Sequence, residues 1–309
     1  MKLMIIVNLY GGIGNQLFQY CFAHTVGDKL GQAIYVNKVG FENRSDGHGE
    51  FLTDGLSFQG MQDCMLCKKS ELLFTKSAWK VSDLFVARSK PHDEEELFLK
   101  RARYGFIWSH RAECLLTSLD KLIVKTPVVF IDGYFQWPKM MENTIGYMRE
   151  HVIFRHSIDG KNEEYIKRIV ESESVCVHIR RGDYAKFPSL QICNYDYYRQ
   201  AMEWIKSRIR HPVFYIFSDD IEWVREHYRF PWDVVYIEER NISSVELHLM
   251  SSCKHFVLSN SSFSWWAQAL CGNDNKSVVV PGPWVTDSRR PAVYLQEFHV
   301  IETAGKADF

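Results

Sequence analysis

The sequence predicts an α/β fold with two domains, each built on a parallel sheet whose faces are both covered by helices. Two observations support this prediction. Short apolar runs rich in β-branched residues alternate with helical patterns, and the alternation occurs in both halves of the chain. Such alternation is typical of parallel sheets, because each crossover helix returns the chain across one face of the sheet. The polar stretch 156–161 separates the halves, so we expect domains at residues 1–155 and 156–309 with a cleft between them.

The first half opens as a strand, a glycine-rich turn and a helix. Residues 3–9 form an apolar run, glycines follow at positions 11, 12 and 14, and apolar residues then recur at helical spacing from Leu17 to Phe22. A second strand is expected at 33–36, as a crossover unit requires. Further along we expect a loop over 40–60, helices and irregular segments over 61–123, a strand over 127–133 and a helix over 140–152.

The second half repeats the alternation more regularly. Strands are expected at 174–179, 212–217, 234–237, 256–258 and 277–280. Helices are expected at 162–172, 195–209, 222–227, 244–252 and 264–270.

Composition excludes several classes of protein. The 309 residues carry a formal net charge of −1, so no global basic field exists to hold nucleic acid. No stretch approaches the roughly 20 apolar residues of a membrane span, and the first apolar run is too short for a secretory signal. The eight cysteines include several in apolar runs, which favours a reducing cytoplasm. Cys64 and Cys67 form a lone C-x-x-C without a second pair, so we expect no structural zinc.

Three polar clusters follow strands of the second half, where ligands bind in open α/β sheets. The first contains His178, Arg180, Arg181 and Asp183. Two guanidiniums suit a diphosphate because they are permanently charged and donate in a forked geometry. The adjacent glycine lets the backbone approach a ligand, and Asp183 can lock one guanidinium in place. A plain ion pair at a strand end is the structural alternative, and the two arginines favour the anion site.

The second and third clusters are less specific. Asp219 and Asp220 suit ribose hydroxyls, a base edge or Mg²⁺, but either can equally cap the helix that follows. Asn260, Ser261 and Ser262 precede a helix, whose first backbone N–H groups form an anion site. One serine would suffice as a cap, so the whole cluster favours phosphate binding.

The glycine loop of the first half fits no standard nucleotide motif. Gly12-x-Gly14 lacks the third glycine of the dinucleotide fingerprint, and no Gly-Lys-Ser/Thr follows. A tight strand-to-helix turn explains the glycines but not the amides of Asn15 and Gln16, which we expect to face the cleft.

Taken together, these segments resemble the family 11 glycosyltransferases, the α-1,2-fucosyltransferases, in their bacterial form. Four segments in family order carry the likeness: residues 11–20, 132–136, 178–184, and 249–255 running into 260–266. The resemblance implies a GT-B-like architecture with two Rossmann-like domains facing a central cleft. It also implies inverting transfer of fucose from GDP-β-L-fucose to the 2-hydroxyl of a terminal galactose during synthesis of a surface glycan, with no metal or other cofactor.

The resemblance also implies roles for individual residues. Arg180 would contact the β-phosphate and stabilise the leaving group, with Asp183 shaping that site. The donor-binding residues would be His178, Arg181, Glu246, Asn260, Ser261 and Ser262, with Glu246 reading guanine. Asn15 and Gln16 would face fucose or the acceptor. The expected location is the cytoplasm, with a peripheral position at the inner face of the membrane as the alternative.

Two questions stay open at this level. Some related α-1,6-fucosyltransferases have a glutamate base eight residues after the first arginine, where this chain has Pro188. Candidate bases in the first half are Glu42, Asp46, Glu50 and Asp54. Transfer of another sugar such as mannose, transfer to another acceptor hydroxyl, and a non-catalytic glycan- or nucleotide-binding protein are the competing interpretations.

Overall fold

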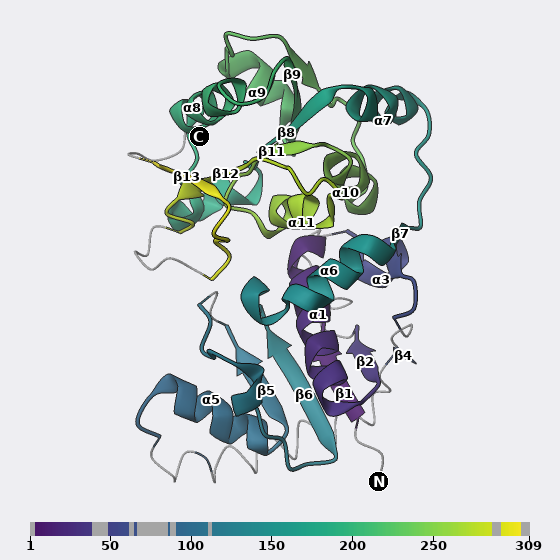
Figure 1. Ribbon diagram of the computed structural model, residues 1–309, viewed down its shortest axis with the longest axis vertical. Coiled ribbons are helices and arrows are strands. Elements are labelled where there is room, and N and C mark those ends of the chain that lie inside the picture. Colours follow the sequence, from purple (N-terminus) through teal and green to yellow (C-terminus); the bar gives the residue numbers. More distant parts are fainter. Residues whose placement is uncertain are drawn as a thin grey trace. The chain divides into compact units, whose positions relative to one another are not determined.

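The computed structural model describes residues 4–38, 49–61, 65–66, 86, 91–110, 113–285 and 292–303 (Figure 1). The chain forms two compact units. The first comprises residues 1–52, 57–148 and 291–293, and the second comprises 53–56, 149–290 and 294–309. The polar stretch 156–161, expected as the link, instead joins strand β7 (Val152–Phe154) to helix α7 (Lys161–Glu171) within the second unit.

A five-stranded parallel sheet organises the first unit, with strand order β4-β2-β1-β6-β5. Its strands are β1 (Met4–Asn8), β2 (Ile34–Asn37), β4 (Met65–Leu66), β5 (Phe106–Ser109) and β6 (Val128–Gly133). The glycine turn leads from β1 into α1 (Ile13–Leu30), and Gly11 has a φ of +79°, a conformation that favours glycine. Ile5, Ile6 and Val7 of β1 are fully buried, and Ile6 belongs to a core cluster with Phe106 of β5 and Phe130 of β6.

The remaining helical elements of the first unit are short. They include α5 (Glu94–Arg103), α6 (Glu142–His151), η1 (Leu119–Lys121) and η2 (Pro138–Met140). Asp93 caps α5 by accepting the backbone N–H of Glu96, and acidic residues fill the first turn of that helix, as its dipole favours. The segments α3 (Leu52–Gly55) and β3 (Leu56–Phe58) lie where the sequence predicted a loop.

The second unit contains a six-stranded parallel sheet of order β10-β9-β8-β11-β12-β13. Its strands are β8 (Glu173–Ile179), β9 (Pro212–Ser218), β10 (Val234–Tyr236), β11 (His255–Val257), β12 (Val278–Gly282) and β13 (His299–Glu302). Its helices besides α7 are α8 (Tyr195–Lys206), α9 (Ile221–His227), α10 (Ser243–Ser251) and α11 (Ser262–Leu270), with the short turns η3 (Asp183–Lys186) and η4 (Pro188–Leu190).

Helices cover both faces of this sheet, and the alternation along β8 shows how (Figure 1). Val175, Val177 and Ile179 join the core formed with α8 and α9. Cys176 and His178 lie on the opposite face, and the His178 ring lies near Phe263 of α11. Because both faces are buried, β8 is a continuous apolar run rather than an alternating one.

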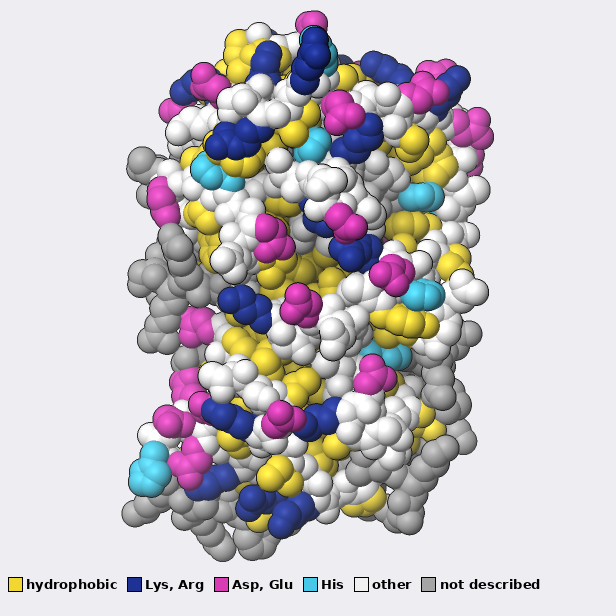
Figure 2. Space-filling model, in the orientation of Figure 1, with side chains coloured by type: hydrophobic (Ala, Val, Ile, Leu, Met, Phe, Trp, Pro, Cys, Tyr) yellow, Lys and Arg dark blue, Asp and Glu magenta, His cyan; other side chains and the backbone are white. Residues whose placement is uncertain are grey.

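The α/β prediction with two parallel sheets is confirmed, and each strand and helix expected in the second half is present. The sequence did not predict β4, β5 or β13, which lie at sheet edges. Six cysteines are described, and all are free thiols; Cys64 and Cys67 lie outside the described residues. Within the described segments, every helix is too short or too polar to cross a bilayer. On the face shown in Figure 2, basic and acidic side chains are interspersed.

Candidate functional site

The three polar clusters of the second half meet at one edge of the second sheet. Residues 180–182 follow β8, residues 219–220 follow β9, and residues 258–262 follow β11. These strands are parallel and β8 pairs with both others, so their carboxyl ends share an edge. The alternation of strands and helices therefore brings together side chains that are far apart in sequence, such as those of Arg180 and Ser262.

Arg180 is held by a carboxylate from the next strand. Its Nη1 lies 3.1 Å from Oδ2 of Asp219, and both side chains are about a quarter exposed. The second carboxylate oxygen of Asp219 accepts the backbone N–H of Arg181 at 2.9 Å. The Arg180 guanidinium also lies over the ring of Tyr184, 5.7 Å from its centre. One carboxylate thus fixes both a guanidinium and the loop that bears it.

Arg181 is held separately. Its Nε lies 3.3 Å from Oδ2 of Asp220, and its guanidinium stacks on the ring of Trp223. Asp220 occupies the N-cap position of α9, but its side chain makes no capping hydrogen bond, so its carboxylate serves the arginine instead. That Asp183 also locks a guanidinium, as the sequence led us to expect, stays a prediction. The backbone of Asp183 begins η3, and its side chain lies outside the described residues.

Glu246 on α10 belongs to the same electrostatic cluster. The pKa of this carboxyl is raised to about 7, mainly by burial and also by the charge of Asp219, while the charge of Arg180 opposes the rise. The carboxyl is thus within electrostatic range of both partners of the Arg180–Asp219 pair. Glu246 therefore adds a group that changes charge near neutral pH at this edge of the sheet.

His178 supports the site from within the protein. It is 2% exposed, and its Nδ1 forms a 2.8 Å hydrogen bond with the hydroxyl of Ser259. Burial, followed by the charge of Arg180, lowers the pKa of His178 to about 3, so the ring is neutral at physiological pH. Its expected contact with a nucleotide does not follow from this geometry; the ring orients the loop after β11.

Asn260 ties the loops of this edge together. Its side-chain amide donates to the backbone carbonyls of Leu190 and Trp284, at 3.0 and 2.9 Å. Its own backbone carbonyl accepts the hydroxyl of Tyr184 at 2.9 Å. The residue is 3% exposed, so it positions the loops. The sequence had led us to expect that its amide would contact a ligand, and this geometry does not support that expectation.

Ser261 and Ser262 open helix α11. The hydroxyl of Ser261 accepts the backbone N–H of Phe263 at 3.3 Å, which caps the helix. Ser262 is the first residue of the helix and is partly exposed. The N-terminus of a helix of nine residues, at the same edge as two arginines, is an arrangement that suits a phosphate.

In the first unit, the two amides that follow the glycine loop differ. Gln16 is fully buried: its amide donates to the carbonyls of Gly11 and Glu50 and accepts from the backbone N–H of Leu52. It fastens the glycine loop to the segment that starts at residue 49, so the expectation that it faces a sugar is wrong. Asn15 accepts a 3.2 Å hydrogen bond from Gln136.

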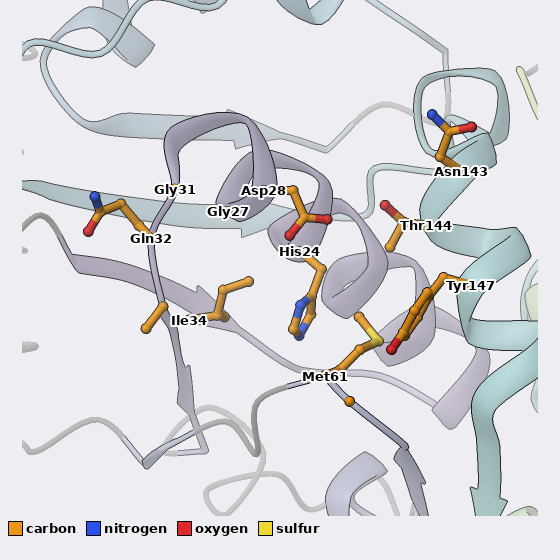
Figure 3. A pocket seen from close by; sticks show the side chains of 12 residues that line it. His24, Gly27, Asp28, Gly31, Gln32, Ile34, Met61, Asn143, Thr144 and Tyr147 are labelled. Carbon is orange, nitrogen blue, oxygen red and sulfur yellow. The ribbon is translucent and has the colours of Figure 1, made fainter.

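A cavity of about 740 Å³ also lies in the first unit, away from the glycine loop. Figure 3 shows His24 and Asp28 of α1 and Asn143, Thr144 and Tyr147 of α6 along its wall. Burial lowers the pKa of His24 to about 4, so this ring is neutral. Among its described lining residues there is no Lys or Arg, which makes the cavity suited to neutral polar groups.

Of the candidate bases, Glu42 and Asp46 lie outside the described residues. The backbone carbonyl of Glu50 accepts from Gln16, and Asp54 is an exposed residue of α3.

Similarity to known proteins agrees with this picture. Residues 4–302 match the family described as Glycosyl transferase family 11. An α-1,2-colitosyltransferase of Escherichia coli is 28% identical over 292 residues, covering 91% of this chain and 92% of the relative. The O-antigen biosynthesis glycosyltransferase WbnK of Escherichia coli is 32% identical, covering 94% of this chain and 98% of the relative.

A third relative matches over a shorter segment. Galactoside alpha-(1,2)-fucosyltransferase 1 of Plecturocebus brunneus is 34% identical over 107 residues, which are 32% of this chain and 29% of the relative.

Solved structures share the fold. The fucosyltransferase NodZ from Bradyrhizobium is among them. The crystal structure of NodZ α-1,6-fucosyltransferase with GDP aligns with this chain with a TM-score of 0.54 at 12% sequence identity. The alignment covers 87% of this chain and 92% of the NodZ chain. The architecture is therefore that of the GT-B-like fucosyltransferases, built from two Rossmann-like units. With a family match that spans nearly its whole length, the chain belongs to glycosyl transferase family 11.

Proposed function

We propose that the protein transfers L-fucose from GDP-β-L-fucose to the 2-hydroxyl of a terminal galactose, forming an α-1,2 linkage with inversion. The family match and the names of two relatives, an α-1,2-colitosyltransferase and a galactoside α-(1,2)-fucosyltransferase, support the linkage and the acceptor. The O-antigen role in the name of a third relative supports a surface glycan as the product.

The ion-paired arginine at the carboxyl end of β8 is the observation that carries the proposal. In the reaction, the acceptor O2 forms a bond to C1 of fucose while the bond from C1 to the β-phosphate oxygen breaks. GDP leaves with the bonding electron pair, and the proton of the 2-hydroxyl is released. Negative charge therefore grows on the β-phosphate, and a guanidinium fixed by Asp219 stabilises that charge without having to reorient.

The other residues of the edge complete the donor site in this proposal. The N-terminus of α11, with Ser261 and Ser262, binds phosphate oxygens, and Arg181 adds a second cation. Glu246 accepts from the N1–H and N2–H₂ donors of guanine. Since the arginines supply the positive charge, the reaction proceeds without a metal ion. Asn15 lies on the sugar or acceptor side.

Transfer of colitose is the second candidate, because one full-length relative is named for it. Colitose is L-fucose without the 3-hydroxyl, so both donors present the same diphosphate. A site that hydrogen-bonds the 3-hydroxyl would reject colitose strongly, since the loss leaves buried polar groups unpaired, whereas a site without that contact would accept both.

The decisive experiment offers GDP-fucose, GDP-colitose and GDP-mannose with a panel of galactose-ended glycans and determines the linkage by NMR. We expect an α-1,2-fucosylated product. A colitosylated product alone would establish the second candidate, and transfer of mannose alone would refute both.

The role of Arg180 is tested in parallel by Arg180→Ala, which should lower kcat about 10²- to 10³-fold with the fold retained. A fully active Arg180→Ala protein would refute that role. Binding of GDP-fucose without any product from the wild type would favour a non-catalytic binding protein.

In this proposal the donor is a nucleotide sugar of the cytoplasm. We therefore place the reaction on the cytoplasmic side of the membrane, where the acceptor glycan is assembled. Fractionation of cells that produce the protein tests this location. Recovery outside the cytoplasmic and inner-membrane fractions would contradict it.

A further inference from the structure

A second surface of the second unit lies at the edge of the sheet opposite Arg180. Strands β9 and β10 begin there, and a groove of about 1190 Å³ runs along their first residues. Helix α7 leads directly into β8, and α8 returns the chain from the end of β8 to the start of β9. Both helices therefore end at this edge, and β8, with seven residues, separates it from Arg180 by about 20 Å.

The groove is basic although the whole chain is close to neutral. Arg168 from the end of α7, Lys206 from the end of α8, and Arg210 just before β9 line it, and all three are exposed. Asp233 is the acidic residue among the described residues along the groove. A helix end attracts roughly one cation through its dipole, so α7 and α8 account for Arg168 and Lys206 but not for Arg210.

Several surface cations of this unit are paired with carboxylates, whereas the three that line the groove are not, among the residues that the structure describes. Lys161 and Arg225 both pair with Glu238, and Arg199 pairs with Glu203. Within the described part of the chain, neither Arg168 nor Lys206 nor Arg210 makes an ion pair. Their charge is available to an external anion.

Aromatic and apolar side chains lie among the cations. Phe230, Pro231 and Trp232 line the same groove, and Nζ of Lys206 lies 5.2 Å from the centre of the Trp232 ring. Trp beside Lys and Arg is typical of the interface between lipid headgroups and acyl chains, where the ring lies at headgroup level and the cations meet phosphates.

We infer that this groove docks the protein on an anionic phospholipid membrane. Lys206, Arg210 and Arg168 meet lipid phosphates, and Trp232 lies at headgroup level. The inference rests on the proposed function for its setting, a membrane-bound acceptor glycan. A separation of about 20 Å between the groove and Arg180 suits modification of the outer end of such a glycan rather than its lipid-proximal sugar.

Cosedimentation of the full chain with vesicles tests the inference. Vesicles of phosphatidylcholine with one quarter phosphatidylglycerol are compared with pure phosphatidylcholine, at low and high salt and without donor or acceptor. We expect binding to the anionic vesicles that weakens with salt. Each cation removed should weaken binding about fivefold, so Lys206→Glu with Arg210→Glu should weaken it at least about 25-fold.

Lys167→Glu is the matched control, because it makes the same charge change on α7 next to Arg168 but outside the groove lining. It should retain vesicle binding to within about fivefold. The double variant should keep its activity on a soluble galactoside, which shows that it is folded and that failure here is separate from failure of the proposed function. Equal vesicle binding by the double variant and wild type would overturn the inference, as would no binding by the wild type. It would also be overturned if the wild type bound single-stranded RNA more tightly than vesicles and the double variant lost that RNA binding.

Discussion

The carboxylate of Asp219 holds Arg180 and its loop at the same time. One oxygen lies 3.1 Å from Nη1 of Arg180, and the other accepts the backbone N–H of Arg181 at 2.9 Å. Asp219 belongs to the loop after β9, and the arginines follow the neighbouring strand β8. Asp219 thus preorganises the guanidinium, although its own negative charge cannot stabilise a leaving phosphate. Four predictions follow from this cluster and from its surroundings.

Asp219→Asn tests whether that preorganisation matters. Asparagine retains an oxygen that can accept the Arg181 N–H but lacks the charge that aligns Arg180. We expect kcat to fall about a hundredfold, as for other misplaced catalytic groups, with the unfolding transition little changed. Steady-state kinetics and thermal unfolding check both points. Asp220→Asn is the control: its carboxylate is more exposed and pairs with Arg181, so a loss as large as that of Asp219→Asn would contradict the special role of Asp219.

Gly182→Ala perturbs the same carboxylate from the other side. A Cβ at position 182 would lie 2.3 Å from Oδ2 of Asp219, the end of a side chain that can rotate away. The fold should therefore tolerate the substitution, but the carboxylate should leave Arg180, and kcat should fall on the order of tenfold to a hundredfold.

Gly146→Ala is the matched change, because an added Cβ there meets nothing within 4 Å. It lies on α6, where alanine favours the helix by about 1 kcal/mol, so it should be fully active and slightly more stable. Equal activity of the two alanine variants would show that Asp219 does not need its present position.

Glu246→Gln should change how stability depends on pH. Burial raises the pKa of Glu246 from the ordinary 4.5 to about 7. The stability contributed by the protonated carboxyl is present below about pH 4.5 and is lost as the pH rises through about 7. Glutamine cannot ionise, so the stability of the variant relative to wild type should increase as the pH rises through this range. The increase in the free energy of unfolding should be on the order of 1 to 3 kcal/mol.

Urea unfolding at several pH values measures this difference. Glu173→Gln gives the opposite trend as a control, because the ion pair with Lys254 lowers the pKa of Glu173 and its contribution is lost as the pH falls. A difference between Glu246→Gln and wild type that stays constant with pH would mean that Glu246 is not desolvated in the folded protein.

The central strands were predictable from sequence, but of the edge strands only β10 was predicted, and β4, β5 and β13 were not. β8 and β9 are continuous apolar runs because both faces are buried, and no helical period fits them. β13 is a partly buried edge strand, and its residues from His299 to Glu302 alternate too little to stand out. The parallel order then fixes which loops meet, so the clustering of polar residues at one edge followed from topology.

The partners within the site were less predictable. The ion pairs of Arg180 with Asp219 and of Arg181 with Asp220 were not predicted, because the next strand lies closer in space than the sequence distance implies. Nothing in the pattern distinguishes Trp223, on which Arg181 stacks, from a core residue. Gln16 resembles a ligand-facing amide because of its place after a glycine loop, and only the fold reveals its bonds to backbone groups.

Activity in excess EDTA is the last prediction. Nucleotide-sugar transfer needs positive charge at the departing diphosphate, and a divalent cation or a fixed guanidinium can supply it. Arg180 and Arg181 lie at the carboxyl end of β8, opposite the N-terminus of α11, and both are covalently part of the protein. A chelator cannot remove them. We therefore expect kcat/KM with GDP-fucose to change less than about twofold in excess EDTA, a small energetic difference.

Adding Mg²⁺ back provides the matching control, since a metal-dependent enzyme regains activity and a metal-free one does not change. Complete loss in EDTA that Mg²⁺ restores would contradict the assignment of leaving-group stabilisation to Arg180. It would instead direct attention to the carboxylates of Asp219 and Asp220 after β9, whose oxygens are of the kind that Mg²⁺ prefers. The Arg180→Ala variant distinguishes the two cases, because only a metal-dependent enzyme would keep substantial activity without the guanidinium.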